Sequence, residues 1–253
     1  MISSIFHSLL YKPFYNALVL LAAFVPGGDI GLAVIILTIC VRIILLPLTH
    51  RQLHTQKKMK SVEGELKSIR DKFKDNKPEQ TKQMMELYKK HGINPLSGFL
   101  LILIQIPILL ALYFVFKDGI PFTGEDLYNF VTLPEITNFK FLGIFDLTTK
   151  NYILAVLVGV SQYFQIRLAL PPIPKDSVQS GQQKGFAEEL AKSMNTNMRY
   201  VMPVMITVFA ANFPSVISLY WLTSNLFAIG HELIVRRKAQ QLVNPNPQSS
   251  QTS

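Results

Sequence analysis

The chain has 253 residues, of which 49% are hydrophobic and 16% are charged, and its mean hydropathy is +0.27. This composition is too apolar for an ordinary soluble domain, and the chain is too short for a large transporter, so we expect a compact membrane protein. The single cysteine, Cys40, excludes a disulfide framework and a metal site built from several cysteines.

Residues 1–29 contain a short apolar stretch, Phe14–Val25, followed by a Pro-Gly-Gly sequence. The stretch is too short to cross a bilayer, so it predicts a helix that lies in the membrane interface. A signal-peptide core is the weaker alternative, because only Lys12 flanks the stretch and no small-residue cleavage site follows it. We therefore expect 1–29 to be an extracytoplasmic N-terminal segment with an interfacial helix.

Five longer apolar stretches follow, and each predicts a helix that crosses the membrane. The fourth is short, but "NFPS" leads from it directly into the fifth, so these two predict a tight helical hairpin with Pro214 at the turn. Residues 30–235 are thus expected to form an all-α membrane core. The predicted spans are Ile30–Leu48, Phe99–Phe116, Tyr152–Leu170, Tyr200–Phe213 and Val216–Val235.

Segment 50–95, between the first two spans, has its own helical pattern. Apolar side chains recur every three or four residues over 59–73 and again over 84–91, with Gly92 as the expected C-cap. The pattern predicts a helical hairpin whose helices cover each other's apolar faces while their lysines stay in water. Because the hairpin is longer than a connection needs, contact with a partner is favoured over a role as a spacer.

The other connections carry weaker signals. The outer loop 117–151 has no clear periodicity, and the Pro, Gly, Ser and Gln residues that begin loop 171–199 predict a flexible segment. Phe186–Met198 predicts a short helix before the fourth span. The polar tail 236–253 is expected to be disordered.

Basic residues are distributed unevenly along the chain. Segment 49–98 holds twelve of the 25 lysines and arginines, whereas 117–150 holds three against five acidic residues. By the positive-inside rule, segments 50–95 and 171–199 and the C-terminus face the cytoplasm, and the N-terminus lies outside. Topology therefore explains most of the net charge of +9. Specific nucleic-acid binding is disfavoured, although part of the charge is available to a ribosome or to anionic membrane lipids.

Arg42 lies inside the first predicted span, in "GLAVIILTICVRIILLPLTH". One alternative is that its side chain snorkels to headgroups beyond Leu48. The Cα–Cβ bonds of a helix tilt toward its N-terminus, which here lies away from that interface, and this argues against snorkelling. The five predicted spans contain no Asp or Glu except Glu232, near the end of the last, so water or polar side chains must solvate the arginine.

Polar side chains that can do so occur on several predicted spans. A single one of them, a serine or threonine above all, is also explained by an ordinary interhelical hydrogen bond. Two glutamines three residues apart, together with an unpaired arginine, favour a water-filled, positively charged cavity between helices. The candidate residues are Arg42, Thr38, Gln105, Gln162, Gln165 and Asn225.

The known enzyme motifs fit poorly. "HELIV" at 231–235 lacks the second histidine of a zinc-protease helix, and "GVSQY" around Ser161 lacks the second glycine of a nucleophile elbow. There is no Gly-rich phosphate loop, and the spans lack the mid-membrane carboxylates of ion-coupled transporters. We therefore expect no enzymatic chemistry, no cofactor and no metal. A small anion-binding transporter or channel and a pure assembly scaffold remain alternatives.

Five motifs occur in order between residues 8 and 238: "VRIILLPLT", "ELYKKHGINPLSG", "LIQIPILLALYFV", "FLGIFDLT" and "MPV…NFPS…LYWLTSNL". Together they resemble the YidC-type membrane protein insertases of the YidC/Oxa superfamily. The resemblance implies five transmembrane helices, a cytoplasmic helical hairpin and a hydrophilic groove open to cytoplasm and lipid. By position, Arg42 matches the family's groove arginine, Gln165 or Gln162 its polar residue on the third helix, and Trp221 an aromatic residue on the fifth.

The resemblance also implies partners and leaves some of them open. A large extracytoplasmic domain before the first span and a lipobox cysteine are both absent, so we expect a minimal form. Basic residues in the tail end at Lys238, so ribosome contact would rest on the hairpin and loops, and partnership with a Sec translocon is open.

The sequence thus predicts a multi-pass protein of the bacterial inner membrane that acts as an insertase and chaperone. Nascent single-spanning proteins with acidic translocated tails would be held in the groove by Arg42, while their apolar segments enter the lipid without nucleotide hydrolysis.

Overall fold

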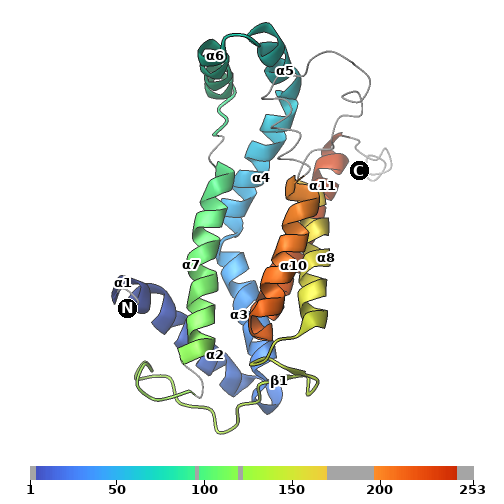
Figure 1. The fold of residues 1–253 in the computed structure, drawn as a ribbon. Helices are drawn as coiled ribbons and strands as arrows, with labels where there is room; N and C mark the ends of the chain where they lie inside the picture. The colour runs from blue at the N-terminus through green and yellow to red at the C-terminus, as the bar shows by residue number, and fades with distance from the viewer. Residues whose placement is uncertain (1–3, 95–96, 119–121, 170–196, 244–253) are drawn as a thin grey trace, which may run out of the picture.

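The computed structural model describes residues 4–94, 97–118, 122–169 and 197–243. These residues are mostly helical, as predicted, with one small antiparallel β-hairpin of strands β1 (Lys140–Phe141) and β2 (Phe145–Asp146) that the sequence patterns did not predict. Figure 1 shows the hairpin at one end of the molecule, the N-terminal helices close to it, and a pair of helices from segment 50–95 at the opposite end.

The N-terminal segment is helical from Ser4 onward, as α1 (Ser4–Phe6), the π-helix η1 (His7–Tyr11) and α2 (Lys12–Phe24). The predicted helix Phe14–Val25 falls within α2, which begins earlier because Pro13 is well tolerated in a first helical turn. A short 3-10 turn, η2 (Pro26–Gly28), then reverses the chain. Gly28 has φ +62°, and a Cβ atom there would lie 2.1 Å from the carbonyl oxygen of Ile136, so only glycine fits this turn.

Asp29 begins α3 (Ile30–Ile44) and also fastens the β-hairpin to it. Its Oδ1 accepts hydrogen bonds from the backbone N–H groups of Gly31 (2.8 Å) and Leu32 (3.2 Å), which is the arrangement of a helix N-cap. Its Oδ2 accepts from the N–H of Leu142 (2.7 Å), which lies in the hairpin turn at φ 52°. A single buried carboxylate therefore fixes both the start of α3 and the position of the hairpin.

The first predicted span, Ile30–Leu48, differs from the structure at its end. Helix α3 stops at Ile44, Leu45 is a break, and α4 (Leu46–Ser61) begins as a separate helix. Pro47 explains the break, because it has no N–H to donate to the carbonyl four residues earlier and its ring crowds that carbonyl.

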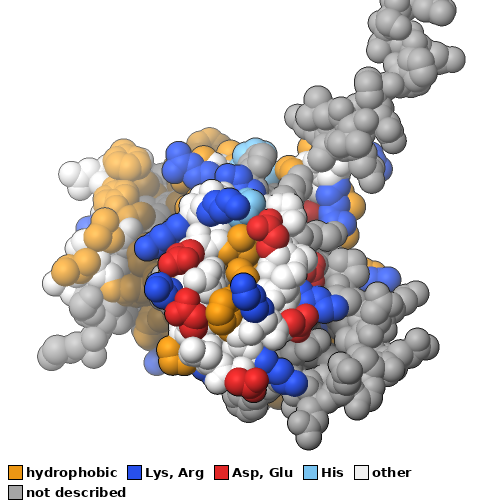
Figure 2. Space-filling model, turned by 90° about the horizontal axis from the view of Figure 1, so that it is seen from above, with side chains coloured by type: hydrophobic (Ala, Val, Ile, Leu, Met, Phe, Trp, Pro, Cys, Tyr) orange, Lys and Arg blue, Asp and Glu red, His pale blue; other side chains and the backbone are white. Residues whose placement is uncertain are grey.

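Segment 50–95 continues through α4 into α5 (Glu63–Lys72) and α6 (Lys77–Lys90). The apolar faces of α5 and α6 pack on each other as predicted, and Gly92 ends α6 at φ +60°. Helix α6 begins earlier than the apolar pattern does, because Asn76 caps it by accepting a hydrogen bond from the N–H of Glu79 (3.2 Å). Figure 2, viewed from this end, shows basic and acidic side chains interspersed over the surface. The small core between the helices contains Val62, Leu66, Leu87 and Ile93.

The remaining helices are α7 (Ser97–Asp118), α8 (Tyr152–Ala169), the π-helix η4 (Asn197–Val201), α10 (Met202–Asn212) and α11 (Ser215–Val243). Within the described residues, α8 alone is both long and apolar enough to cross a membrane by itself, and Ile30–Ile44 and Ile104–Lys117 are shorter apolar helical stretches. The turn between α10 and α11 contains Pro214, as predicted.

The predicted disordered tail 236–253 is wrong for its first part, because α11 continues to Val243. Residues 236–243 lack helix breakers, so the helix runs on until the Asn-Pro sequence that begins at 244. The predictions for most of loop 171–199, including most of the helix Phe186–Met198, and for 244–253 lie outside the described residues.

Helix α11 joins two hydrophobic clusters. Its first turns, with Val216, Ile217 and Tyr220, belong to a cluster that also contains residues of α2, α3 and α7, whereas Trp221 and Leu222 pack against α8 and α10. Gly159 allows close packing of α8 on α10, since a Cβ atom there would lie 1.8 Å from the Thr207 hydroxyl oxygen. The helices that carry the candidate site are therefore held by one shared helix.

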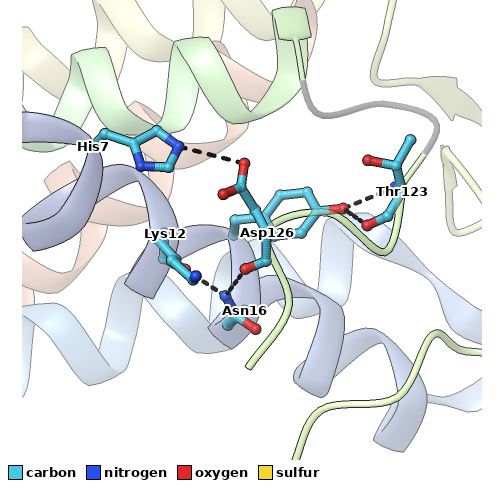
Figure 3. A network of polar contacts seen from close by, with 6 residues as sticks. His7, Lys12, Asn16, Thr123 and Asp126 are labelled. Carbon is cyan, nitrogen blue, oxygen red and sulfur yellow. Dashed lines mark hydrogen bonds and ion pairs between the residues drawn. The ribbon is translucent and has the colours of Figure 1, made fainter. Parts of the chain in front are cut away.

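The segment after α7 closes the hairpin end of the molecule through polar contacts (Figure 3). Asn16 of α2 donates to the Asp126 carbonyl oxygen (2.8 Å) and accepts from the Tyr128 N–H (2.7 Å), and His7 lies 3.3 Å from the Asp126 carboxylate. Farther along, hydrogen bonds from the Thr148 hydroxyl and N–H lower the pKa of the Asp146 carboxyl. The contacts of Asn16 and His7 fix the predicted outer loop against the first helices.

Candidate functional site: a polar cluster among the apolar helices

Arg42 lies in the last turn of α3, among side chains that are otherwise almost all apolar. Its Nη2 lies 3.4 Å from Oε1 of Gln105 on α7, a long hydrogen bond. Among the described residues, no carboxylate lies within ion-pair distance of the guanidinium. The arginine therefore keeps a net positive charge that its immediate neighbours do not neutralise.

Gln105 connects Arg42 to a third helix. While its Oε1 faces the guanidinium, its Nε2 donates a 2.7 Å hydrogen bond to the phenol oxygen of Tyr220 on α11, a residue only 2% exposed. The amide thus uses its acceptor toward the cation and its donor toward the phenol, which is the favourable orientation for both. Arg42, Gln105 and Tyr220, here called the arginine cluster, bring α3, α7 and α11 together.

Tyr220 is the member of this cluster that the sequence patterns missed. In "LYWLTSNL" it is adjacent to Trp221, and a tyrosine in an apolar span is readily taken for a packing residue. The signal that could have identified Tyr220 is its hydroxyl group, which requires a hydrogen-bond partner when it is buried.

Thr38 lies one turn before Arg42 but does not contribute a polar group to it. Its hydroxyl donates to the carbonyl oxygen of Val34 (2.6 Å) within α3, and the residue is 2% exposed. This is the common intrahelical arrangement of a threonine in an apolar helix.

Gln162, Gln165 and Trp221 form a second group, here called the glutamine cluster. Gln162 of α8 donates from Nε2 to Oε1 of Gln165 (2.9 Å) and accepts from Nε1 of Trp221 (3.0 Å). The indole ring also packs edge-on against Phe209 of α10 at a centroid separation of 6.0 Å. The two glutamines, which were candidates from their spacing, and the tryptophan, which was a candidate from the resemblance, therefore lie together.

Asn225 has a structural partner rather than a place in either cluster. Its Nδ2 donates to the Ser161 hydroxyl (3.0 Å), which in turn donates to the Val158 carbonyl oxygen (2.8 Å), and both side chains are buried. This hydrogen bond fixes the register of α8 against α11.

The two clusters share α11 without sharing a hydrogen bond among the described residues. Tyr220 and Trp221 are consecutive, so their side chains point about 100° apart around the helix axis. One belongs to the arginine cluster and the other to the glutamine cluster. Nowhere in the described ranges do three or more His, Cys, Asp or Glu side chains gather as a metal-binding group would require.

Comparisons with known proteins place this arrangement in a family. A family model described as "60Kd inner membrane protein" matches residues 21–242. The membrane protein insertase MisCA of Bacillus subtilis is 33% identical over 241 residues, which cover 93% of this chain and 80% of that protein. The membrane protein insertase YidC of Fusobacterium nucleatum is 35% identical over 211 residues, or 83% of this chain and 88% of that one.

A solved structure also shares the fold. The crystal structure of an active YidC insertase with its first transmembrane domain resolved matches with a TM-score of 0.56 and 22% sequence identity. The match covers 90% of this chain and 45% of the crystallised one. The family model and the relatives together show that the chain belongs to the YidC/Oxa family of bacterial inner-membrane proteins.

Proposed function

We propose that this protein is a membrane protein insertase that holds the polar part of a nascent chain at Arg42 while the adjacent apolar segment enters the lipid. The observation that carries the proposal is the arginine cluster, in which a guanidinium among apolar helices is bonded to a neutral glutamine, which is in turn bonded to a neutral tyrosine. Two insertases among the relatives, each covered over most of its length, support it.

The energetics favour a role for the charge. An arginine at mid-membrane depth costs about 2.5–3.5 kcal/mol on insertion scales, and a purely structural position could be filled by an apolar residue at no such cost. Gln105 can orient the guanidinium, and Tyr220 can hold the Gln105 amide, but neither side chain can neutralise the charge. The charge is thus available to an acidic segment of a substrate.

No nucleotide hydrolysis is needed in this mechanism. Each apolar side chain of the substrate gains about 1.5–3 kcal/mol on leaving water, so transfer of an entire segment supplies the driving force. A hydrated groove lined by Arg42, Gln105 and the glutamine cluster would shorten the hydrocarbon layer that the polar part must cross. The protein would then lower a barrier without covalent chemistry.

We also propose the topology, with five crossings, the N-terminus outside and the α5–α6 pair in the cytoplasm. The position of that pair at the end opposite to the β-hairpin supports this assignment (Figure 1). The substrates would be single-spanning membrane proteins with acidic translocated tails. A ribosome, a Sec translocon and membrane lipids are further proposed partners.

Reconstitution into vesicles without an ion gradient tests the function. Two substrates that differ only in tail charge, one acidic and one neutral, should both be inserted by the wild-type protein. Arg42→Ala should reduce insertion of the acidic one by about tenfold, the equivalent of about 1.4 kcal/mol, and leave the neutral one nearly unchanged. Arg42→Lys should keep most activity, because attraction requires the charge rather than the planar fork.

Equal losses of insertion for both substrates in Arg42→Ala would contradict the charge mechanism. They would mean that Arg42 only stabilises the packing of the helices. Uptake of a soluble anion, with no insertion of either substrate, would instead favour a transporter.

A further inference from the structure

A hollow of about 680 Å³ lies between α8 and α11, here called the α8/α11 furrow. Leu222 lines it, and because Leu222 and Tyr220 are two positions apart, they point about 200° apart around the axis of α11. The furrow therefore lies on the face of α11 that is turned away from the arginine cluster. The two helices pack side by side along it (Figure 1).

Apolar side chains line most of the furrow, and several of them remain about half exposed. Leu157, Val160 and Phe164 of α8 are 44%, 48% and 50% exposed, and Leu226 of α11 is 56% exposed. In a membrane protein, such a surface faces lipid tails. The walls of the furrow thus match the chemistry of an acyl chain.

Two arginines stand at one end of the furrow, Arg167 from α8 and Arg236 from α11. The helices run parallel, as the Ser161–Asn225 hydrogen bond and the contact between Arg236 and the Leu168 carbonyl oxygen show. Arg167 lies ten residues beyond Leu157, about 15 Å along the helix, so the furrow has one long apolar part and one basic end.

The basic end carries a net positive charge. Arg236 is paired with Glu232, whose Oε1 lies 2.8 Å from its Nε, whereas Arg167 has no ion-pair partner in the described part of the chain. Arg167 is also exposed, so it is free to meet a ligand.

We propose that the α8/α11 furrow binds an anionic phospholipid, with the phosphate on Arg167 and Arg236 and an acyl chain along the leucines. A guanidinium binds phosphate through two parallel hydrogen bonds, and basic pockets between membrane helices are typical sites for anionic headgroups. The volume lies within the range of about 300–1,000 Å³ of ligand pockets. An apolar substrate helix would gain nothing from Arg167, which favours lipid as the occupant. The proposal rests on the membrane location of the family and not on the insertase function.

Lipid selectivity at the furrow can be measured by tryptophan fluorescence. Trp221→Phe removes the single tryptophan of the chain, and Leu226→Trp then places a reporter in the furrow. Quenching by brominated phosphatidylglycerol is compared with quenching by brominated phosphatidylcholine in mixed bilayers. Val204→Trp is the matched control reporter, because Val204 is exposed on α10 and lies ten residues before the turn at Pro214, whereas Leu226 lies twelve residues after it. We expect phosphatidylglycerol to be preferred about fivefold at position 226 and to show little preference at 204.

Charge variants in the Leu226→Trp protein decide the outcome. Arg167→Gln should reduce the preference to about one, Arg167→Lys should retain most of it, and Arg237→Gln, which removes a neighbouring charge outside the furrow, should leave it unchanged. A preference equal at 226 and 204 with all arginines in place would overturn the proposal, as would an undiminished preference in Arg167→Gln. Quenching that is equal for both lipids and is displaced by an apolar substrate peptide would overturn it too, and would assign the furrow to substrate.

Discussion

The Gln105 side chain separates the charge of Arg42 from the phenol of Tyr220, and this position makes it a sensitive place to test the site. Gln105→Glu would put a carboxylate 3.4 Å from the guanidinium in nearly the same shape. Thermal unfolding should be unchanged or shifted upward, because a charge-assisted hydrogen bond is stronger than a neutral one. Insertion of acidic-tailed substrates should nevertheless fall about fivefold or more, since Arg42 would be neutralised.

Gln105→Leu is the matched control, because it removes the hydrogen bonds but leaves the charge. It should lower the free energy of unfolding by about 1 kcal/mol and keep most insertion of acidic-tailed substrates. If both variants lose insertion activity in proportion to their loss of unfolding free energy, the cluster serves helix packing and not the binding of a charged substrate.

At this scale the sequence predicted the unusual residues but not their pairing. Arg42 and Gln105 stand out because polar groups are costly among apolar ones, whichever way the helices pack. Their contact depends on the rotation of α3 and α7 about their axes, which is set by packing across helices far apart in sequence. Asn225 shows the same limit, because its partner Ser161 lies on another helix. The hydrogen bond from Thr38 to the Val34 carbonyl oxygen is instead local to α3 and is typical of a threonine in an apolar helix.

Among the elements, the α5–α6 pair has a core of its own, so its contribution can be removed separately. Replacing residues 62–93 by a Gly/Ser linker from Ser61 to Asn94 should leave thermal unfolding of the other helices nearly unchanged, because their clusters do not include this core. Insertion should fall sharply if the pair recruits a partner.

Leu87→Ala provides the graded control, because truncating a buried leucine costs about 2–5 kcal/mol and would unfold the pair in place. Insertion that is intact in both variants would make the pair a spacer. Loss in the deletion alone would assign the function to its surface rather than to its rigid fold.

The elements were predictable where their cause is local. The apolar faces of α5 and α6 and the turn at Pro214 follow from periodicity and from the geometry of proline. The break at Leu45 also has a local cause, Pro47. The apolar run continues across this position, so the hydrophobic pattern predicted one uninterrupted helix. The β-hairpin was not predictable, because its position depends on Asp29, more than a hundred residues earlier in the chain.

Across the whole molecule, the proposed groove requires water to reach polar residues on two different helices. Single cysteines at 105 and 162, in a Cys40→Ser background, should react with a water-soluble thiol reagent at least about tenfold faster than cysteines at 106 and 160. These two neighbours are exposed to the outside of the helices, where lipid would cover them, at 50% and 48%. Each pair lies at nearly the same depth, so depth alone cannot produce the difference. Equally slow labelling at all four positions would mean a dry bundle and would contradict the groove.

Because Tyr220 and Trp221 are adjacent on α11, a rotation of this helix about its axis moves a side chain of each polar cluster at the same time. A polar side chain reaches about 5–6 Å from a helix axis, so a turn of about 20° carries each tip roughly 2 Å sideways. That distance is enough to break the 2.7 Å bond from Gln105 to Tyr220 and the 3.0 Å bond from Trp221 to Gln162 in one movement. A segment that binds beside α11 and rotates it would therefore break the hydrogen bonds of both polar clusters together, although no hydrogen bond links the clusters in the described residues.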